Sequence, residues 1–172
     1  MREALMNNLI PEELLAANQW VNWKVITRDG KETKIPIQPN GVAASSTDPQ
    51  TWRPFNELSQ SQPAGFVFTD SDNFIGIDLD GCREVKTGRV EDWAFEIISE
   101  LNTYCEISPS GTGVKLFATC DSDWQHKNKV HVANVPETSE KQPGIEVYDR
   151  GRYFAVTARR LPGYATIRNV TE

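Results

Sequence analysis

The chain has 172 residues, of which 38% are hydrophobic and 24% charged, values typical of a globular protein that exclude a disordered chain. No apolar run approaches the roughly 20 residues that span a bilayer, and the N-terminal segment lacks the continuous apolar region of a signal peptide. We therefore expect a single compact domain, residues 1–172, with no membrane partner.

The net charge of −6 argues against tight, sequence-independent binding of duplex nucleic acid, which usually requires a basic surface. Lysines and arginines nevertheless gather in two stretches, 24–34 and 150–160. Carboxylates that hold divalent ions also count as negative in a sequence, although they are neutralised in the loaded site. The acidic balance thus lowers the expected affinity for nucleic acid without excluding a template-using enzyme.

The three cysteines are Cys82, Cys105 and Cys120, and no two of them have C-x-x-C spacing. An odd number without this spacing favours free thiols over a disulfide framework or a zinc site.

In the first part of the chain, residues 11–19 are expected to form a short helix with a proline near its start. The alternation from Trp20 to Ile26 predicts a strand, and the following Asp-Gly turn and T-K-I-P-I segment predict a hairpin. Pro36 places the second strand of this hairpin at a sheet edge or ends it early. Residues 39–54, rich in Pro, Asn, Gly, Ser and Thr, are expected to be loop.

In the rest of the chain, apolar residues at Trp93, Ile97 and Leu101 predict a helix from about residue 90 to residue 101. The stretch 121–144 is polar and is expected to be loop. Short alternating or apolar runs predict strands at 65–68, 74–80, 103–108, 114–119, 144–149, 152–158 and 164–170. Many strands with two principal helices indicate an α+β fold built on an antiparallel or mixed sheet, without an internal domain boundary.

The segment G-I-D-L-D-G carries two acids, Asp78 and Asp80, that point to the same face of a strand. Two adjacent carboxylates repel each other unless a cation lies between them. Oxygen ligands without a nearby His or Cys suit Mg²⁺ or Mn²⁺. We expect Gly76 and Gly81 to leave room for phosphates. A surface pair at the end of a strand is the alternative.

The segment S-P-S-G-T-G-V-K combines hydroxyl residues and glycines at a junction between strands. Such a loop can offer backbone N–H groups to an anion, and Lys115 can place a charge on a phosphate. It is not a Walker A loop, because a strand rather than a helix should follow. A tight hairpin turn with incidental hydroxyls is an equal alternative. The candidate phosphate-binding residues are Ser108, Ser110, Gly111, Thr112, Gly113 and Lys115.

The segment G-I-E-V-Y-D-R-G-R places Glu146 on the opposite side of a strand from its apolar neighbours Ile145 and Val147. An acid within an apolar strand is costly unless it is paired or bound to a metal. Arg152 follows a glycine turn and is placed to meet phosphates. Asp149 is expected to pair with one of the nearby arginines at the surface.

Together and in this order, seven segments resemble the bifunctional primase-polymerase domain of phages and plasmids, in the archaeo-eukaryotic primase superfamily. The segments are W-V-N-W-K, T-K-I-P-I-Q-P, A-S-S-T-D-P-Q-T-W, G-F-V-F, G-I-D-L-D-G, Y-C-E-I-S-P-S-G-T-G-V-K and I-E-V-Y-D-R-G-R-Y-F-A-V-T. The resemblance implies a sheet related to the RNA-recognition motif with a small N-terminal α/β module. It also implies template-directed nucleotidyl transfer by a two-metal mechanism, in phage or plasmid replication in the cytoplasm of a bacterial or archaeal host.

By position, the resemblance implies that Asp78, Asp80 and Glu146 are catalytic carboxylates that hold Mg²⁺ or Mn²⁺. Lys115 departs from the family, which has a histidine there that contacts the triphosphate. Thr157-Ala158 likewise stands where Thr-Gly is common. The implied partners are nucleoside triphosphates, a single-stranded DNA template and primer, and a helicase domain or protein.

Lys34, in T-K-I-P, is a candidate for a phosphate or template contact, with a solvated lysine on an edge strand as the alternative. Three tryptophans, Trp20, Trp23 and Trp52, are expected in the core rather than as stacking platforms for bases.

One other function is open, and a second is disfavoured by the histidines. A degenerate module of the same fold would bind nucleotide or single strands without synthesis, and Lys115 favours it. An endonuclease of the replication-initiator type needs a His-x-His metal pair and a nucleophilic tyrosine. The two histidines, His126 and His131, have the wrong spacing for this pair and lie in a polar stretch.

Overall fold

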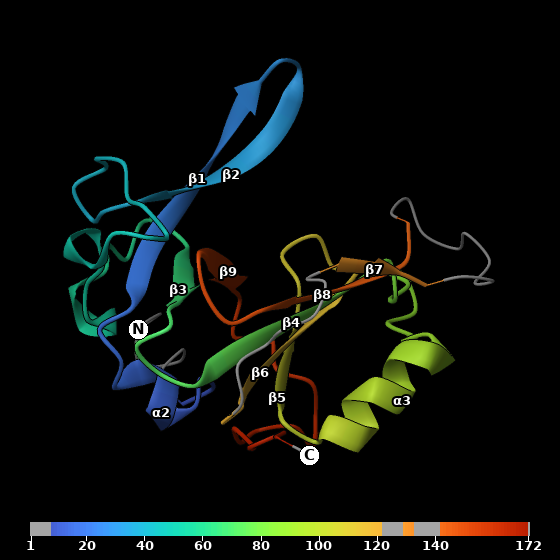
Figure 1. The fold of residues 1–172 in the computed structure, drawn as a ribbon. Coiled ribbons are helices and arrows are strands. Elements are labelled where there is room, and N and C mark those ends of the chain that lie inside the picture. The colour runs from blue at the N-terminus through green and yellow to red at the C-terminus, as the bar shows by residue number, and fades with distance from the viewer. Residues whose placement is uncertain (1–7, 122–128, 133–141, 172) are drawn as a thin grey trace.

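The computed structural model describes residues 8–121, 129–132 and 142–171. These residues form two antiparallel sheets and few helices (Figure 1). One sheet has the strand order β2-β1-β3-β9, and the other has the order β5-β6-β4-β8-β7. This arrangement confirms the expected α+β class with antiparallel sheets. No helix in the described parts of the chain is long and apolar enough to cross a membrane.

The first sheet begins with the predicted hairpin of β1 (Trp20–Arg28) and β2 (Lys31–Ile37). Its turn residues Asp29 and Gly30 have φ values of 52° and 74°, the left-handed conformation that a two-residue hairpin turn requires. Pro36 lies on the edge strand β2, as predicted. Strands β3 (Ala64–Phe68) and β9 (Arg152–Val156) complete the sheet. Residues 39–54 are mainly loop, with a 3₁₀ turn at Pro49–Thr51.

The N-terminal helix α2 spans only Glu12–Leu15, which is shorter than the predicted 11–19. Leu14 is buried, and its carbonyl oxygen accepts hydrogen bonds from the amide of Ala17 and from the indole N–H of Trp20. The chain therefore leaves the helical path after a single turn and enters β1. A second 3₁₀ turn lies at Phe55–Glu57.

The second sheet has β4 (Phe74–Asp80) at its centre, between β6 (Val114–Thr119) and β8 (Gly144–Tyr148). Strand β5 (Tyr104–Ile107) pairs with β6, and β7 (Lys129–His131) pairs with β8. The prediction of loop throughout 121–144 is wrong at β7. This strand has too few residues to show an alternating pattern, and pairing with β8 creates it.

The predicted strand at 164–170 is also wrong. Residues 159–170 run beside β5 and then reach the end of β6. They pair with these strands only through isolated bridges, such as the one between Thr119 and Asn169. Pro162 has no amide proton to donate, and Gly163 has a φ of 92°. These two residues form a turn at the start of the segment, closed by a hydrogen bond from the Tyr164 amide to the Leu161 carbonyl at 3.3 Å.

Helix α3 (Asp92–Leu101) covers one face of the second sheet, close to the predicted 90–101. Its residues Ala94 and Ile98 are fully buried against β4 side chains such as Ile77 and Leu79. Asn102, with a φ of 44°, ends the helix in the left-handed conformation common at C-terminal caps. The three cysteines are free thiols, as predicted.

Aromatic side chains fill the space between the two sheets. They include Trp20, Phe66, Phe68, Phe117 and Phe154, drawn from β1, β3, β6 and β9. The Phe68 and Phe154 rings pack edge to face with centroids 4.9 Å apart. Trp20 and Trp52 are buried, as predicted, whereas Trp23 is half-buried.

Gly76 lies at a close contact between the two sheets. A Cβ atom built on it would lie 2.3 Å from the Phe68 ring and 2.5 Å from the Phe154 ring. Gly76 therefore serves the packing of these rings, and the prediction that it leaves room for phosphates is wrong. Gly81 has a φ of 62° and allows the chain to turn at the end of β4.

Candidate active site

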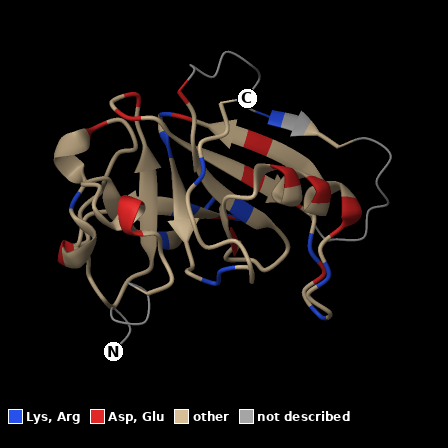
Figure 2. Ribbon diagram, turned by 90° about the horizontal axis from the view of Figure 1, so that it is seen from below, with Lys and Arg blue, Asp and Glu red and all other residues tan. Residues whose placement is uncertain are grey.

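Five charged residues lie in one line across the five strands of the second sheet. The strand register pairs Glu106 with Lys115, Lys115 with Asp78, Asp78 with Glu146, and Glu146 with Lys129. Figure 2 shows red and blue bands, which mark acidic and basic residues, on neighbouring strands. Directly paired residues project from the same face of a sheet, here the face that packs against the first sheet. We call these five residues the charged row.

The centre of the charged row is an ion pair between Asp78 and Lys115. The lysine Nζ lies 2.5 Å from Oδ2 of Asp78, and the two side chains are only 10% and 15% exposed. The ammonium group also lies 4.1 Å from the centroid of the Phe154 ring, within the range of a cation–π contact. Shielding from water makes this attraction stronger than that of a surface ion pair. Loss of either partner would leave the other as an uncompensated, shielded charge.

Glu146 is held by two donors. Lys129 Nζ forms an ion pair with its Oε1, and the Tyr148 hydroxyl donates to its Oε2 at 3.0 Å. Burial raises the pKa of Glu146, but the hydrogen bonds from Lys129 and Tyr148 outweigh this effect and lower the pKa below its usual value. The Arg152 guanidinium, 5.1 Å from the Tyr148 ring centroid, lowers it further. Glu146 is therefore ionised at neutral pH.

Glu106 ends the row and was missed in the sequence. It is fully buried and accepts hydrogen bonds from the amides of Thr157 and Ala158, at 2.8 and 2.9 Å, and from the Tyr104 hydroxyl at 2.9 Å. Burial raises its pKa, although these bonds and the charge of Lys115 oppose the rise. The sequence does contain a signal for Glu106, since it is an acid within the apolar run T-Y-C-E-I. The same pattern, an acid between apolar residues of a strand, identified Glu146.

The turn that binds Glu106 accounts for the glycine that the resemblance places at position 158. Ala158 has a φ of 56°, a conformation that glycine adopts without the steric cost of a Cβ atom. The resemblance places a glycine at this position. Alanine therefore keeps the turn and both amide contacts to Glu106 at a small conformational cost.

Asp80 lies two residues after Asp78, on the same face and at the end of β4. The loop 108–113 packs against this end. A Cβ atom on Gly113 would lie 2.6 Å from the Leu79 carbonyl oxygen and 3.5 Å from the Asp80 Cα, so only glycine allows this approach. The structure thus brings the predicted loop next to the predicted aspartate pair.

The loop is a closed hairpin turn. The amide of Ser108 donates to the carbonyl of Gly113 at 2.9 Å, and the amide of Gly113 donates to the Ser108 hydroxyl at 3.2 Å. The amide of Gly111 donates to the Ser108 carbonyl at 3.0 Å. The Ser110 and Thr112 hydroxyls lie 2.8 Å apart toward solvent. The amides of Ser108, Gly111 and Gly113 are used in hydrogen bonds within the turn. The groups of this loop that face solvent are therefore the hydroxyls of Ser110 and Thr112.

Two arginines that the sequence did not indicate flank this loop. Arg83 Nη1 donates to the carbonyl of Gly111 at 2.9 Å, and Arg159 Nη2 donates to the carbonyl of Ser108. Both guanidinium groups are fixed by the loop backbone. They add positive charge beside the end of β4.

The remaining predicted residues lie in different places. Arg152 begins β9, beside Tyr148 of the second sheet. Lys34 belongs to the hairpin of the first sheet, where its ammonium group lies 5.7 Å from the Trp23 ring centroid. His131 lies on β7 and is exposed, and His126 lies outside the described residues.

The carboxylates of the row match a hard divalent ion in chemistry and in backbone placement. Asp78 and Glu146 are cross-strand neighbours, and Asp80 shares their face. In the described parts of the chain, however, no three acidic, histidine or cysteine side chains converge as a metal cluster. Lysine ammonium groups contact Asp78 and Glu146 instead.

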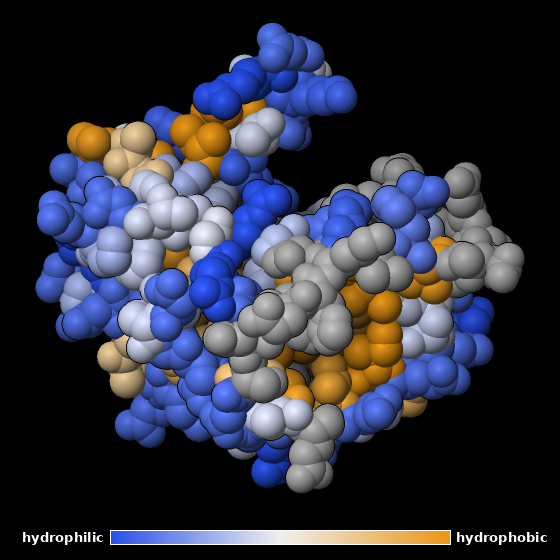
Figure 3. All heavy atoms as spheres, in the orientation of Figure 1, coloured by the Kyte–Doolittle hydropathy of each residue, from blue (hydrophilic) through white to orange (hydrophobic). Residues whose placement is uncertain are grey.

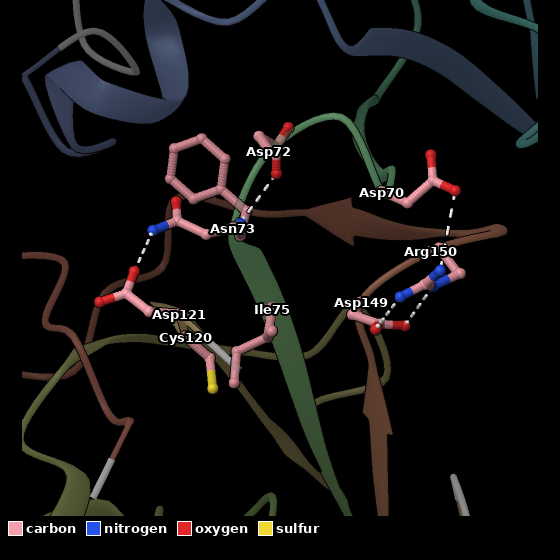
Figure 4. Close-up of a pocket in the computed structure, with 9 residues that line it drawn as sticks. Asp70, Asp72, Asn73, Ile75, Cys120, Asp121, Asp149 and Arg150 are labelled. Atoms are coloured by element: carbon pink, nitrogen blue, oxygen red, sulfur yellow. Dashed lines mark hydrogen bonds and ion pairs between the residues drawn. The ribbon is translucent and has the colours of Figure 1, made fainter. Parts of the chain in front are cut away.

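A second group of acids surrounds a cavity of about 230 Å³ at the opposite end of β4 (Figure 4). It is lined by Asp70, Asp72, Asp121 and Asp149 together with Arg150. The Arg150 guanidinium contacts Asp149 at 2.9 Å, as predicted, and Asp70 at 3.7 Å. These acids lie on connections between strands rather than in register within a sheet.

Comparison with known proteins bears on the function of this arrangement. No model of a known protein family matches the chain. The chain is 34% identical over 161 residues to the DNA primase-polymerase of Nitratiruptor phage NrS-1. The match covers 88% of this chain but 21% of that protein, so the chain spans about a fifth of the length of the curated relative it matches. Over most of its length, the chain is therefore similar to one part of a phage primase-polymerase.

Proposed function

We propose that this chain is the nucleotidyl-transfer domain of a primase-polymerase. The observation that carries the proposal is the register of β4 with β8, which sets Asp78 directly beside Glu146. The similarity to a phage primase-polymerase supports it independently. The α+β fold with antiparallel sheets is compatible with the primase type, including a sheet related to the RNA-recognition motif beside an N-terminal module.

In this proposal Asp78, Asp80 and Glu146 hold Mg²⁺ or Mn²⁺. When bound, a pair of such ions lowers the pKa of the attacking 3′-hydroxyl and stabilises charge on the departing pyrophosphate. The contacts of Lys115 with Asp78 and of Lys129 with Glu146 support a site that attracts positive charge. An incoming ion would exchange these lysine contacts for its own.

The other residues act on the triphosphate by charge and position. Lys115, released from Asp78, is close enough in the row to meet a phosphate. Arg152 and the hydroxyls of Ser110 and Thr112 extend the same face toward the nucleotide. Tyr148 keeps Glu146 oriented through its hydroxyl.

Glu106 has a supporting role in this proposal. It is the cross-strand neighbour of Lys115 on the side away from Asp78. Its carboxyl group borders the lysine on that side, and its three hydrogen bonds fix its position. Lys115 therefore lies between two acids, and a phosphate must compete with both of them.

The substrates of the proposed reaction are nucleoside triphosphates and a single-stranded DNA template with its primer. A helicase domain or protein is the proposed partner in phage or plasmid replication, which would take place in the cytoplasm of the host. These assignments rest on the relative, of which the chain covers a fifth.

A second candidate function is binding of nucleotide or single-stranded DNA without synthesis. One observation favours it. A lysine stands at position 115, where the family has a histidine, and it lies 2.5 Å from a carboxylate oxygen that metal binding requires. A lysine that stays on Asp78 would exclude the ion and leave a binding module.

Extension of a labelled primer on a single-stranded template tests the proposal. We expect Asp78→Ala and Glu146→Ala to reduce extension by at least about a hundredfold with Mg²⁺ or Mn²⁺. Asp121→Ala, at the opposite end of β4, is the matched control and should extend like the wild type. Extension by both site variants would contradict the assignment. Nucleotide binding by the wild type without incorporation would favour the second candidate.

A further inference from the structure

The β1–β2 hairpin is an arm that extends beyond its sheet. The ladder between β1 and β3 covers Trp20 to Asn22, whereas residues 24–28 of β1 pair with β2. In Figure 1 this outer part rises away from the body of the molecule. Figure 3 shows a notch between the arm and the lobe that contains the second sheet.

One face of the arm continues the face of β1 that packs toward the second sheet at Trp20. Trp20 packs in the aromatic cluster with Phe117 of β6, so it marks the inward face of β1. Every second residue of a strand shares a face, and residues paired across a hairpin do the same. The inward face therefore continues through residues 24, 26 and 28 of β1 and residues 31, 33 and 35 of β2.

The charged residues on the inward face of the arm are all cations, whereas the outward face carries Glu32 and Lys34. Lys24, Arg28 and Lys31 lie on the inward face, are exposed, and form no ion pair within the described parts of the chain. Glu32 is paired with Thr27 on the outward face. In a chain with a net charge of −6, this is a local cluster of cations without acids on its own face.

Two half-buried apolar side chains, Ile26 and Ile35, lie among these cations on the inward face. Cations spaced along an exposed surface with apolar groups between them suit a single nucleic-acid strand, whose phosphates and unpaired bases are both accessible. A duplex presents its phosphates without its base faces, and the acidic balance of the chain opposes it.

We propose that the inward face of the β1–β2 arm binds the backbone of single-stranded DNA and guides it past the charged row. This inference rests on the proposed function in assigning that strand as the template. Lys34 projects from the opposite face, where it lies over Trp23. The template contact expected from Lys34 is therefore assigned to Lys24, Arg28 and Lys31.

The test is binding of a fluorescent oligothymidylate to the full chain, followed by anisotropy at several salt concentrations. The variant carries Lys24→Gln, Arg28→Gln and Lys31→Gln. If each cation contacts one phosphate, the slope of log K against log salt falls by about 2, because each phosphate contact on a single strand contributes about 0.7. Affinity at low salt should fall at least tenfold.

The matched control removes three exposed cations elsewhere, with Lys86→Gln, Arg89→Gln and Arg168→Gln, and changes the net charge equally. It should bind within about threefold of the wild type with an unchanged salt slope. Lys34→Gln alone should leave the slope unchanged. Circular dichroism of each variant confirms that the fold is intact.

Equal losses in the arm variant and the control would overturn the inference, since net charge alone would then explain binding. It is also overturned if the arm binds an acidic peptide with the same slope but not the oligonucleotide. Failure of the proposed function has a different signature. In that case the wild type would show the arm-dependent binding of DNA but would incorporate no nucleotide.

Discussion

The two ends of β4 both gather acids, but they do so by different means. At the end with Asp78 and Asp80, neighbouring strands hold carboxylates and lysines in register on one shielded face. At the other end, Asp70, Asp121 and their neighbours lie on connections around a cavity and contact an arginine and amide side chains. The number of acids is similar, but only the first set is fixed by two ladders. Fixed carboxylates are what metal-dependent chemistry requires.

The largest expected effect separates the two ends by metal binding. Asp78→Asn removes a charge that we assign to the metal site, so Mn²⁺ binding measured by electron paramagnetic resonance should weaken at least about a hundredfold. Asp121→Asn removes an acid whose pKa is lowered by hydrogen bonds from Asn73 and Asn169, and it should leave the affinity nearly unchanged. If Asp121→Asn has the larger effect, the metal belongs to the cavity end.

A smaller effect comes from the cations at each end. Lys115→Met removes the ammonium group that competes for Asp78, so Mn²⁺ affinity without nucleotide should rise about tenfold. Arg150→Met is the matched change at the cavity and should leave Mn²⁺ affinity unchanged. Lys115→His, which introduces the histidine that the resemblance implies at this position, should keep or raise primer extension. A collapse of extension in Lys115→His would show that the lysine has a role of its own.

The smallest effect concerns stability and tests whether the row is strained at Glu106. Burial raises the pKa of Glu106 above its value in the unfolded chain. The free energy of unfolding is therefore highest below about pH 4.3, where Glu106 is protonated in both states, and it falls as pH rises through the folded pKa. Glutamine does not titrate. The melting temperature of Glu106→Gln relative to the wild type should therefore rise between pH 4 and 8.

The exposed Glu100→Gln substitution, on α3, is the control for this pH series and should follow the wild type at every pH. A melting-temperature difference between Glu106→Gln and the wild type that falls with pH would mean that the hydrogen bonds to Glu106 and the charge of Lys115 outweigh its burial.

Local patterns were sufficient to predict the strands that carry the row, except β7, which bears Lys129 and was expected to be loop. Alternation placed Asp78 and Glu146 on strands, and the glycine-rich segment between residues 108 and 113 was identified as a junction. Cross-strand partners were not predictable, because register depends on which distant segments pair. The positions of Glu106 and Lys129 beside Lys115 and Glu146 follow from pairings that no local pattern encodes.

Close packing was the second feature that the sequence concealed. Gly76 was expected to admit phosphates, but the rings of Phe68 and Phe154 occupy the space beside it. The sequence around a glycine does not show whether the space beside it is filled by a ligand or by an aromatic ring. The distinction requires knowing that β3 and β9 pack over β4, which is a property of the tertiary fold.

The central position of β4 has a consequence for how this domain tolerates change. Hydrogen-bonded ladders on both edges prevent the strand from sliding, and a shift by one residue would turn Ile77 or Leu79 to the acidic face and direct Asp78 toward α3. Insertions in the connections between strands leave this alignment untouched, whereas a single-codon deletion inside β4 would disrupt it. Homologous domains can therefore differ widely in loop length while the spacing within this strand stays constant.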